Sequence, residues 1–173
     1  MKTIYLARHA KSSWSSGFTK DFDRPLNSRG ESDAIKMGKA MQDLSWYPEK
    51  IIASPAIRVK QTCKAYCKII DYSIENIEWN TDIYAAYTIT LLQLLTSLDE
   101  NTNSIMLIGH NPAIEDLLIH LCGYSKVNET KQSDGKIFTT ANVAKLTTNS
   151  AWKDLVMDEM SLEKLLRPKE LNQ

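Results

Sequence analysis

The stretch SIMLIGHNPAIEDLLIHLCG, residues 104–123, carries the clearest structural signal in the sequence. Its first part, residues 104–110, is an apolar run of the length typical of a buried strand. Asn111-Pro112 then favours the start of a helix, and Gly123 is placed to end it. A strand that leads directly into a helix is the repeating unit of α/β proteins, so this stretch predicts an α/β fold.

The same alternation recurs toward the N-terminus. Apolar runs predict short strands in residues 3–8, 50–54 and 75–80. Helices are expected in residues 28–44, 54–70 and 88–100. Ser28 has capping-box spacing to Glu31, and Ser54-Pro55 has the form of a helix N-cap followed by its first residue.

The C-terminal third predicts antiparallel pairing. Residues 141–148 (ANVAKLTT) and 152–160 (WKDLVMDEM) are expected to form two late strands, joined as a hairpin through Asn149-Ser150. Residues 161–171 are expected to form a short edge element or a tail. The expected architecture is one domain, residues 1–173, with three α/β/α layers. Its central sheet is mostly parallel with an antiparallel edge strand.

Composition excludes several classes of protein. The 173 residues carry 21 Lys plus Arg and 21 Asp plus Glu, and a net charge of zero argues against a broad nucleic-acid binder. No apolar run approaches the roughly 20 residues of a membrane span, and the N-terminus reaches Arg8 too soon for a signal peptide. Three sparse cysteines indicate neither a disulfide framework nor a zinc site. We therefore expect a cytoplasmic protein with no nucleic-acid or membrane partner.

Basic side chains and histidines follow three of the predicted strands. The first strand ends in Arg8-His9, the second is followed by Arg58 one turn into a helix, and the fourth ends in His110. If these strands are parallel neighbours, their carboxyl ends bring the four side chains to one pocket.

This quartet suits phosphoryl transfer. Two guanidinium groups offer planar sets of donors that clamp a dianionic phosphoryl group. A neutral histidine can attack phosphorus as a nucleophile. A second histidine, protonated beside the phosphate, can stabilise charge on its oxygens. The chemistry requires no metal or other cofactor, and none is expected.

Three motifs resemble the signatures of the histidine phosphatase superfamily, which has the phosphoglycerate mutase-like fold. They are RHA (8–10), SPAIRVKQT (54–62) and LIGHNP (107–112). DFDRPLNSRGESDA (21–34), together with the short chain, resembles the SixA-type phosphohistidine phosphatase branch. The first motif of the family is most often Arg-His-Gly, and here Ala10 replaces the glycine.

The resemblance implies a role for each matching residue. His9 corresponds to the nucleophile that becomes phosphorylated, Arg8 and Arg58 to the phosphate-binding arginines, and His110 to the second pocket histidine. Arg24 corresponds to a further arginine near the phosphate in this branch. Its alternative is a structural role, in which Arg24 pairs with Asp21 or Asp23 and fixes the loop.

The expected function is a phosphatase with a covalent phosphohistidine intermediate. Ester phosphatases of this fold carry an acidic general acid after the second strand and helix, but residues 71–91 offer Glu75, Glu78 and Asp82 in no recognisable motif. An imidazole leaving group needs such an acid less than an alkoxide does. The sequence therefore favours phosphohistidine on a signalling or phosphotransfer protein as substrate, with Asp21 or Asp23 as possible proton donors.

Two other functions stay open: a phosphatase of a small phosphorylated metabolite, and a phosphate-binding module without turnover. Lys11, Ser12 and Ser13 either line the phosphate pocket or face water. Trp14 either forms an aromatic lip or packs on the loop. His120 is expected at the boundary of the core.

Overall fold

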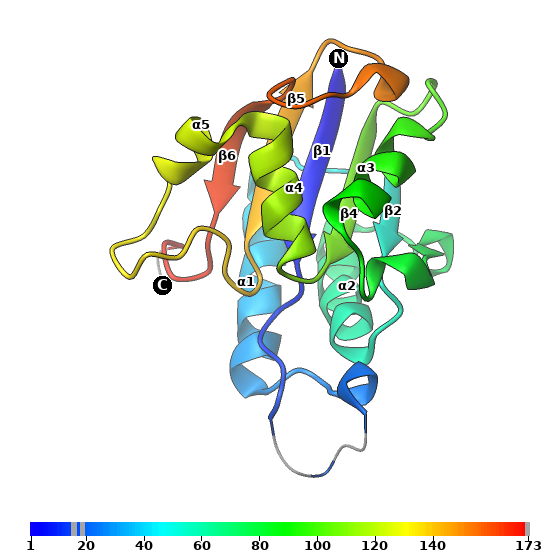
Figure 1. Ribbon diagram of the computed structural model, residues 1–173. Helices are drawn as coiled ribbons and strands as arrows, with labels where there is room; N and C mark the ends of the chain where they lie inside the picture. Colours follow the sequence, from blue (N-terminus) through cyan, green and yellow to red (C-terminus); the bar gives the residue numbers. More distant parts are fainter. Residues whose placement is uncertain (15–16, 18–19, 172–173) are drawn as a thin grey trace.

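The central sheet has six strands in the order β3-β2-β4-β1-β5-β6 (Figure 1). The computed structural model describes residues 1–14, 17 and 20–171, so residues 15, 16, 18 and 19 of the expected loop, and the last two residues of the expected domain, lie outside the described part. The strands are β1 (Lys2–Arg8), β2 (Lys50–Ala53), β3 (Glu78–Trp79), β4 (Ser104–Gly109), β5 (Val143–Thr148) and β6 (Ser161–Leu166).

The three strands that precede the candidate residues are parallel neighbours, as the sequence predicts. β4 pairs in parallel with β1 on one side and with β2 on the other. In this register Arg8 lies beside Gly109, and Ala53 lies beside Ile108. The carboxyl ends of all three strands therefore meet at one edge of the sheet.

Helices cover both faces of the sheet (Figure 1). Helices α1 and α2 pack on one face, and α3 and α4 pack on the other, which gives the expected three layers. The helices are α1 (Ser28–Asp43), α2 (Ile57–Ile70), α3 (Thr88–Thr96), α4 (Ala113–Cys122) and α5 (Tyr124–Asn128).

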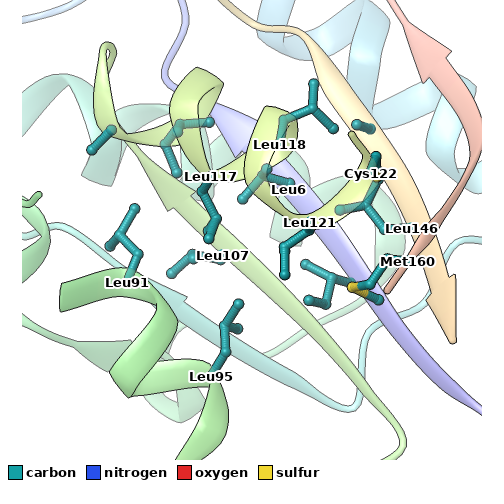
Figure 2. Close-up of a cluster of buried hydrophobic side chains, with 14 of the residues drawn as sticks. Leu6, Leu91, Leu95, Leu107, Leu117, Leu118, Leu121, Cys122, Leu146 and Met160 are labelled. Carbon is teal, nitrogen blue, oxygen red and sulfur yellow. The ribbon is translucent and has the colours of Figure 1, made fainter. Parts of the chain in front are cut away.

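Alternate residues of the central strands feed two separate cores. In β1, Ile4 and Leu6 pack under α3 and α4, while Tyr5 and Ala7 pack under α1 and α2. This alternation is what a strand covered on both faces requires. Figure 2 shows the first of these cores, where leucines of β1, β4, α3 and α4 interdigitate. Burial on both faces fixes the strands, and hence the positions of their ends.

Two helix starts differ from the predicted ones. The N-cap of α1 is Asn27, whose side chain accepts a hydrogen bond from the Gly30 amide, so Ser28 is already the first helical residue. Helix α2 begins at Ile57 and not at Pro55. The Ser54 hydroxyl is instead hydrogen-bonded to the His110 ring, a partner distant in sequence.

Two helix ends can also be compared with the prediction. Helix α3 ends at Thr96, four residues before its predicted end. Gly123, with φ of 83°, follows the last residue of α4 as expected.

The predicted strand over residues 152–160 is wrong. Trp152 is fully buried and begins a short 3-10 helix, Trp152–Asp154, because its indole nitrogen donates to the Thr102 carbonyl 2.8 Å away. The last strand is β6, in the segment predicted as an edge element or tail. It pairs antiparallel with β5, which itself runs antiparallel to β1. The strand that runs against the others is therefore β5, which lies next to the edge strand β6.

Candidate active site

The ends of β1, β2 and β4 place the candidate residues side by side. The His9 amide donates to the Gly109 carbonyl at 3.1 Å, and the Ser54 amide donates to the Ile108 carbonyl at 3.1 Å. These bonds extend the parallel ladder by one residue on each strand. His9, Ser54 and His110 therefore leave the sheet at the same level, and the two histidine rings lie 5.0 Å apart between centroids.

His9 is held in one tautomer. Its Nδ1 lies 2.7 Å from the Ala10 carbonyl oxygen, which can only accept, so Nδ1 carries the proton. Nε2 then has a free lone pair, and this atom accepts from Arg58 Nε at 3.3 Å. The ring is buried, with 8% of the residue exposed, so the lone pair is directed into the site and not into bulk water.

Arg58 connects both histidines to the loop above them. Its Nη2 donates to His110 Nδ1 at 3.3 Å and to the Asp21 carboxylate at 2.9 Å. Its Nη1 donates to the Asp21 carbonyl at 2.6 Å. Because Arg58 stands in the first turn of α2, the helix fixes this fork of donors across the ends of the strands.

Ser54 orients His110. Since His110 Nδ1 accepts from Arg58, the neutral ring carries its proton on Nε2, which donates to the Ser54 hydroxyl at 2.8 Å. From the sequence, Ser54 was expected only to cap a helix. Its position could have indicated the contact with His110, because Ser54 follows β2 and His110 follows the neighbouring strand β4.

Both histidines favour the neutral form. Burial lowers the pKa of His9 to about 3, with nearby His110, Arg58 and Arg8 acting in the same direction against the Ala10 hydrogen bond. Burial and Arg58 lower the pKa of His110 to about 4, although Asp21 opposes this shift. At neutral pH the pocket therefore holds two uncharged imidazoles beside cationic guanidiniums, an arrangement suited to an anion.

Arg8 is held by a loop from beyond α5. Its Nη1 donates to the Phe138 carbonyl at 2.9 Å, and Asn111 donates to the same oxygen at 3.0 Å. Glu115 accepts from both Asn111 and the Phe138 amide at 3.1 Å. Arg8 Nε is buried and has no hydrogen-bond partner in the described part of the chain. The guanidinium therefore keeps donor capacity for a ligand.

A second set of residues forms the rim above these strand ends. We define the mouth of the site as Asp21, Phe22, Arg24 and Tyr84. Asp21 accepts from Arg24 at 2.6 Å, from Arg58 at 2.9 Å and from the Tyr84 hydroxyl at 2.8 Å. Partial burial opposes ionisation of Asp21, but these donors outweigh it and lower its pKa to about 2.

Arg24 binds the loop that carries the mouth. Its Nε donates to the Ser13 carbonyl and its Nη2 to the Ser12 hydroxyl, while Nη1 pairs with Asp21. The guanidinium also stacks on Trp14, 3.5 Å from the ring centroid. These contacts fit the structural alternative for Arg24, in which it pairs with Asp21 and fixes the loop, and its role in phosphate binding stays a prediction. Asp23, the second possible proton donor, is exposed at the end of a short 3-10 helix, Asp21–Asp23.

The turn after His9 is fixed by close packing on α1 and α2. The Ala10 amide donates to Thr62 Oγ1 at 3.1 Å. A Cβ added at Gly30 would lie 2.1 Å from the Lys11 carbonyl oxygen, so only glycine admits the backbone there. His120, by contrast, lies half-buried on α4, away from these residues.

Two features are absent from residues 1–14, 17 and 20–171: a metal-ligand cluster and a helix that could span a membrane. No cluster of three or more His, Cys, Asp or Glu side chains there could hold a metal ion. None of the helices in this part combines the length and apolar character needed to cross a bilayer.

Sequence relatives cover most of the chain. An uncharacterized chloroplastic protein of Arabidopsis thaliana is 33% identical over 132 residues, 72% of this chain, and the chain spans 61% of that relative's length. An uncharacterized protein of Mycobacterium leprae is 26% identical over 159 residues, 90% of this chain and 95% of the relative.

Solved structures share the whole fold. A protein of Agrobacterium tumefaciens named for the phosphohistidine phosphatase SixA has a TM-score of 0.81 at 28% identity, covering 96% of this chain and 98% of its own. The protein histidine phosphatase SixA complexed with tungstate has a TM-score of 0.80 at 19% identity, covering 98% and 99%.

A family model supplies the last comparison. Residues 4–81, which include Arg8, His9, Asp21, Arg24 and Arg58, match the model of the histidine phosphatase superfamily (branch 1). With the structural matches, this places the protein in a known family: the chain belongs to the histidine phosphatase superfamily.

Proposed function

We propose that the protein is a metal-independent phosphatase in which His9 accepts the phosphoryl group, and that its substrate is phosphohistidine on a signalling or phosphotransfer protein. The observation that carries the proposal is the pairing of His9 Nδ1 with the Ala10 carbonyl. This bond leaves Nε2 unprotonated and facing the guanidinium of Arg58. A neutral, oriented imidazole beside an anion-binding group is the arrangement that a phosphoryl acceptor requires.

In the first step, His9 Nε2 forms a bond to phosphorus as the bond from phosphorus to the leaving group breaks. The electron pair of the broken bond stays with the leaving group. When that group is an imidazole already protonated on its other nitrogen, it departs neutral. Arg8 and Arg58 bind the non-bridging oxygens, so charge redistributed in the transition state is matched by fixed donors.

In the second step, water attacks the phosphohistidine on His9. The bond from Nε2 to phosphorus breaks, its electron pair returns to Nε2, and a proton of the water is released to solvent or to phosphate. His110 faces the pocket through Nδ1, because Ser54 holds its Nε2 proton. A bound phosphoryl dianion favours protonation of that nitrogen, which then becomes one more donor to phosphate oxygen.

Asp21 fits a positioning role better than a proton-donor role. Its carboxylate accepts from Arg24, Arg58 and Tyr84, and its pKa of about 2 means that it is ionised at neutral pH. An ionised carboxylate has no proton to give to a leaving group. The arrangement therefore favours a leaving group that needs little protonation, which supports phosphohistidine over alkyl phosphates.

The alternative substrate, a small phosphorylated metabolite, has a precedent in the same fold. A solved structure named as a phosphoserine phosphatase of Entamoeba histolytica, 14% identical, shares it with a TM-score of 0.67. In the present chain Glu78 pairs with Lys50 at 2.7 Å, so this carboxylate is engaged on the outer strands. Glu75 and Asp82 are exposed.

A substrate panel tests the proposal. The wild-type protein and His9→Ala would be assayed on a histidine-phosphorylated phosphotransfer domain, an aryl phosphate and a set of phosphorylated metabolites. We expect the phosphohistidine protein to give the highest kcat/KM, and His9→Ala to lose all three activities. A higher kcat/KM on a metabolite would establish the small-molecule alternative. No turnover of any substrate by the wild type would leave a phosphate-binding module.

A further inference from the structure

We propose that Tyr84, with Phe22 beside it, forms an aromatic wall that selects a planar aromatic leaving group over an alkyl alcohol. This inference rests on the proposed function and concerns the departing half of the substrate, whereas the arginines and histidines below act on the phosphoryl half. Tyr84 is thus a specificity-determining residue.

The wall consists of two rings in contact with the site. The centroids of Phe22 and Tyr84 lie 5.0 Å apart with the rings at 70°, and those of Tyr84 and His110 lie 5.4 Å apart at 87°. The Arg58 guanidinium carbon is 5.8 Å from the Tyr84 ring centroid. Phe22 and Tyr84 are only half-buried, so each ring keeps surface that a substrate can cover.

The segment that carries Tyr84 is fixed to the sheet. The Asn80 amide donates to the Ala53 carbonyl at 2.9 Å, which ties the segment to the end of β2. Ile83 is buried so close to β4 that a Cβ at Gly109 would lie 2.9 Å from its side chain. Tyr84 follows directly, so its ring is positioned by the core and not by a loose loop.

The hydroxyl of Tyr84 is already committed. It donates to Asp21 at 2.8 Å, and burial together with Asp21 raises the pKa of the phenol, so it stays protonated. The part of Tyr84 that remains for a substrate is therefore the ring. A ring and a hydroxyl with separate partners can be tested by separate substitutions.

The direction of attack brings the leaving group to this side of the site. In-line displacement by His9 Nε2, which lies at the strand ends, sends the leaving group away from the sheet, toward the mouth. An imidazole there gains ring-to-ring contact with an aromatic wall, which an alkyl chain cannot reproduce. The wall also keeps water from one side of the departing ring.

The test compares free phosphohistidine with free phosphoserine, which share the amino-acid backbone and differ in the leaving group. The quantity measured is the ratio of their kcat/KM values, which does not depend on the fraction of enzyme that is folded. Tyr84→Leu and, separately, Phe22→Leu should lower this ratio about threefold to tenfold, the range expected for loss of one aromatic contact. Tyr84→Phe should leave the ratio unchanged.

Tyr87→Leu is the matched control, because Tyr87 is 79% exposed on the same segment, and its ratio should equal that of the wild type. An unchanged ratio in both Tyr84→Leu and Phe22→Leu would overturn the proposed role of the aromatic wall. A fall in Tyr84→Phe as large as that in Tyr84→Leu would also overturn it, because the hydroxyl and not the ring would then be responsible. A wild type that hydrolyses phosphoserine but not phosphohistidine would instead overturn the proposed function. The two failures are therefore distinguishable.

Discussion

Two regions of the site differ in how the chain builds them. We define the floor as Arg8, His9, Ser54, Arg58 and His110, which stand at strand ends or in the first turn of α2. The mouth stands on a 3-10 helix and on loops. Backbone ladders and two buried cores fix the floor, whereas side-chain contacts centred on Asp21 fix the mouth.

This difference predicts a division of labour. In the proposed function the floor binds and accepts the phosphoryl group, so substitutions there should affect activity on every substrate. In the same proposal the mouth positions Arg58 from above and surrounds the leaving group, so substitutions there should have smaller effects on activity. Ordered by size, the following expectations test whether the two regions separate in this way.

Arg58→Ala should have the largest effect on activity. The substitution removes the proposed hydrogen-bond donor to phosphate together with the hydrogen bonds to His9 and His110. We expect kcat/KM on an aryl phosphate to fall by about 10²- to 10³-fold, as for loss of a preorganised donor to a transition state. Lys60→Ala, an exposed cation on the same helix, is the matched control and should change little. A fall of similar size in both variants would mean that the loss of one positive charge, and not the position of Arg58, lowers kcat/KM.

Gly30→Ala should lower stability. The added Cβ would lie 2.1 Å from the Lys11 carbonyl oxygen, so α1 or the turn after His9 must move. We expect urea denaturation to show a loss of about 1–3 kcal/mol in the free energy of unfolding. Ser32→Ala, exposed on the same helix, should cost nothing. Full stability in Gly30→Ala would show that the floor does not depend on this contact.

Acidification should destabilise the folded protein, because His9 and His110 of the floor are held in the neutral form. The pKa values of His9 and His110 are about 3 and about 4, below the usual 6.5 of unfolded histidine, so the unfolded chain binds more protons below pH 6.5. Stability is therefore complete above that pH and falls as pH decreases from 6.5 toward 4, by up to about 1.4 kcal/mol per pH unit for each histidine.

Urea denaturation of the wild type and His9→Gln between pH 7 and pH 4.5 would measure this slope. We expect the slope to be smaller in His9→Gln by roughly the contribution of one proton. Equal slopes would mean that His9 is not held neutral in the folded state.

Asp21→Asn should have the smallest effect on activity, and it should be uniform. Asp21 is half-exposed, so its pairing with Arg58 is screened by solvent. We expect kcat/KM to fall by about twofold to fivefold on aryl and alkyl phosphates alike. Asp23→Asn, exposed on the same short helix, is the control. A loss confined to the alkyl phosphate would assign Asp21 the role of general acid and contradict its positioning role.

The floor was predictable from sequence because its determinants are local and periodic. Apolar runs located β1, β2 and β4, and the rule that parallel strands bind ligands at their carboxyl ends brought Arg8, His9 and His110 together. Ser54 was read as a helix cap, because its partner His110 is distant in the sequence.

In the mouth, the sequence indicated Asp21 and Arg24 but not the aromatic residues Phe22 and Tyr84. Nothing in the local sequence around Tyr84 shows that Ile83 anchors it beside His110. The wrong strand over residues 152–160 has a similar cause, since buried Trp152 bonds to the distant Thr102 and turns the chain away from extended pairing. Tertiary partners decided both cases, whereas the periodicity of apolar residues decided the strands of the floor.

Trapping of the phosphorylated protein would show whether His9 accepts the phosphoryl group. The wild type and His9→Ala would be mixed with a labelled phosphate donor, quenched in alkali, where phosphohistidine survives, and digested for mass spectrometry. We expect an acid-labile phosphate on the peptide that contains His9 in the wild type, and no such label in His9→Ala. Equal labelling of both proteins, or hydrolysis retained by His9→Ala, would contradict this expectation.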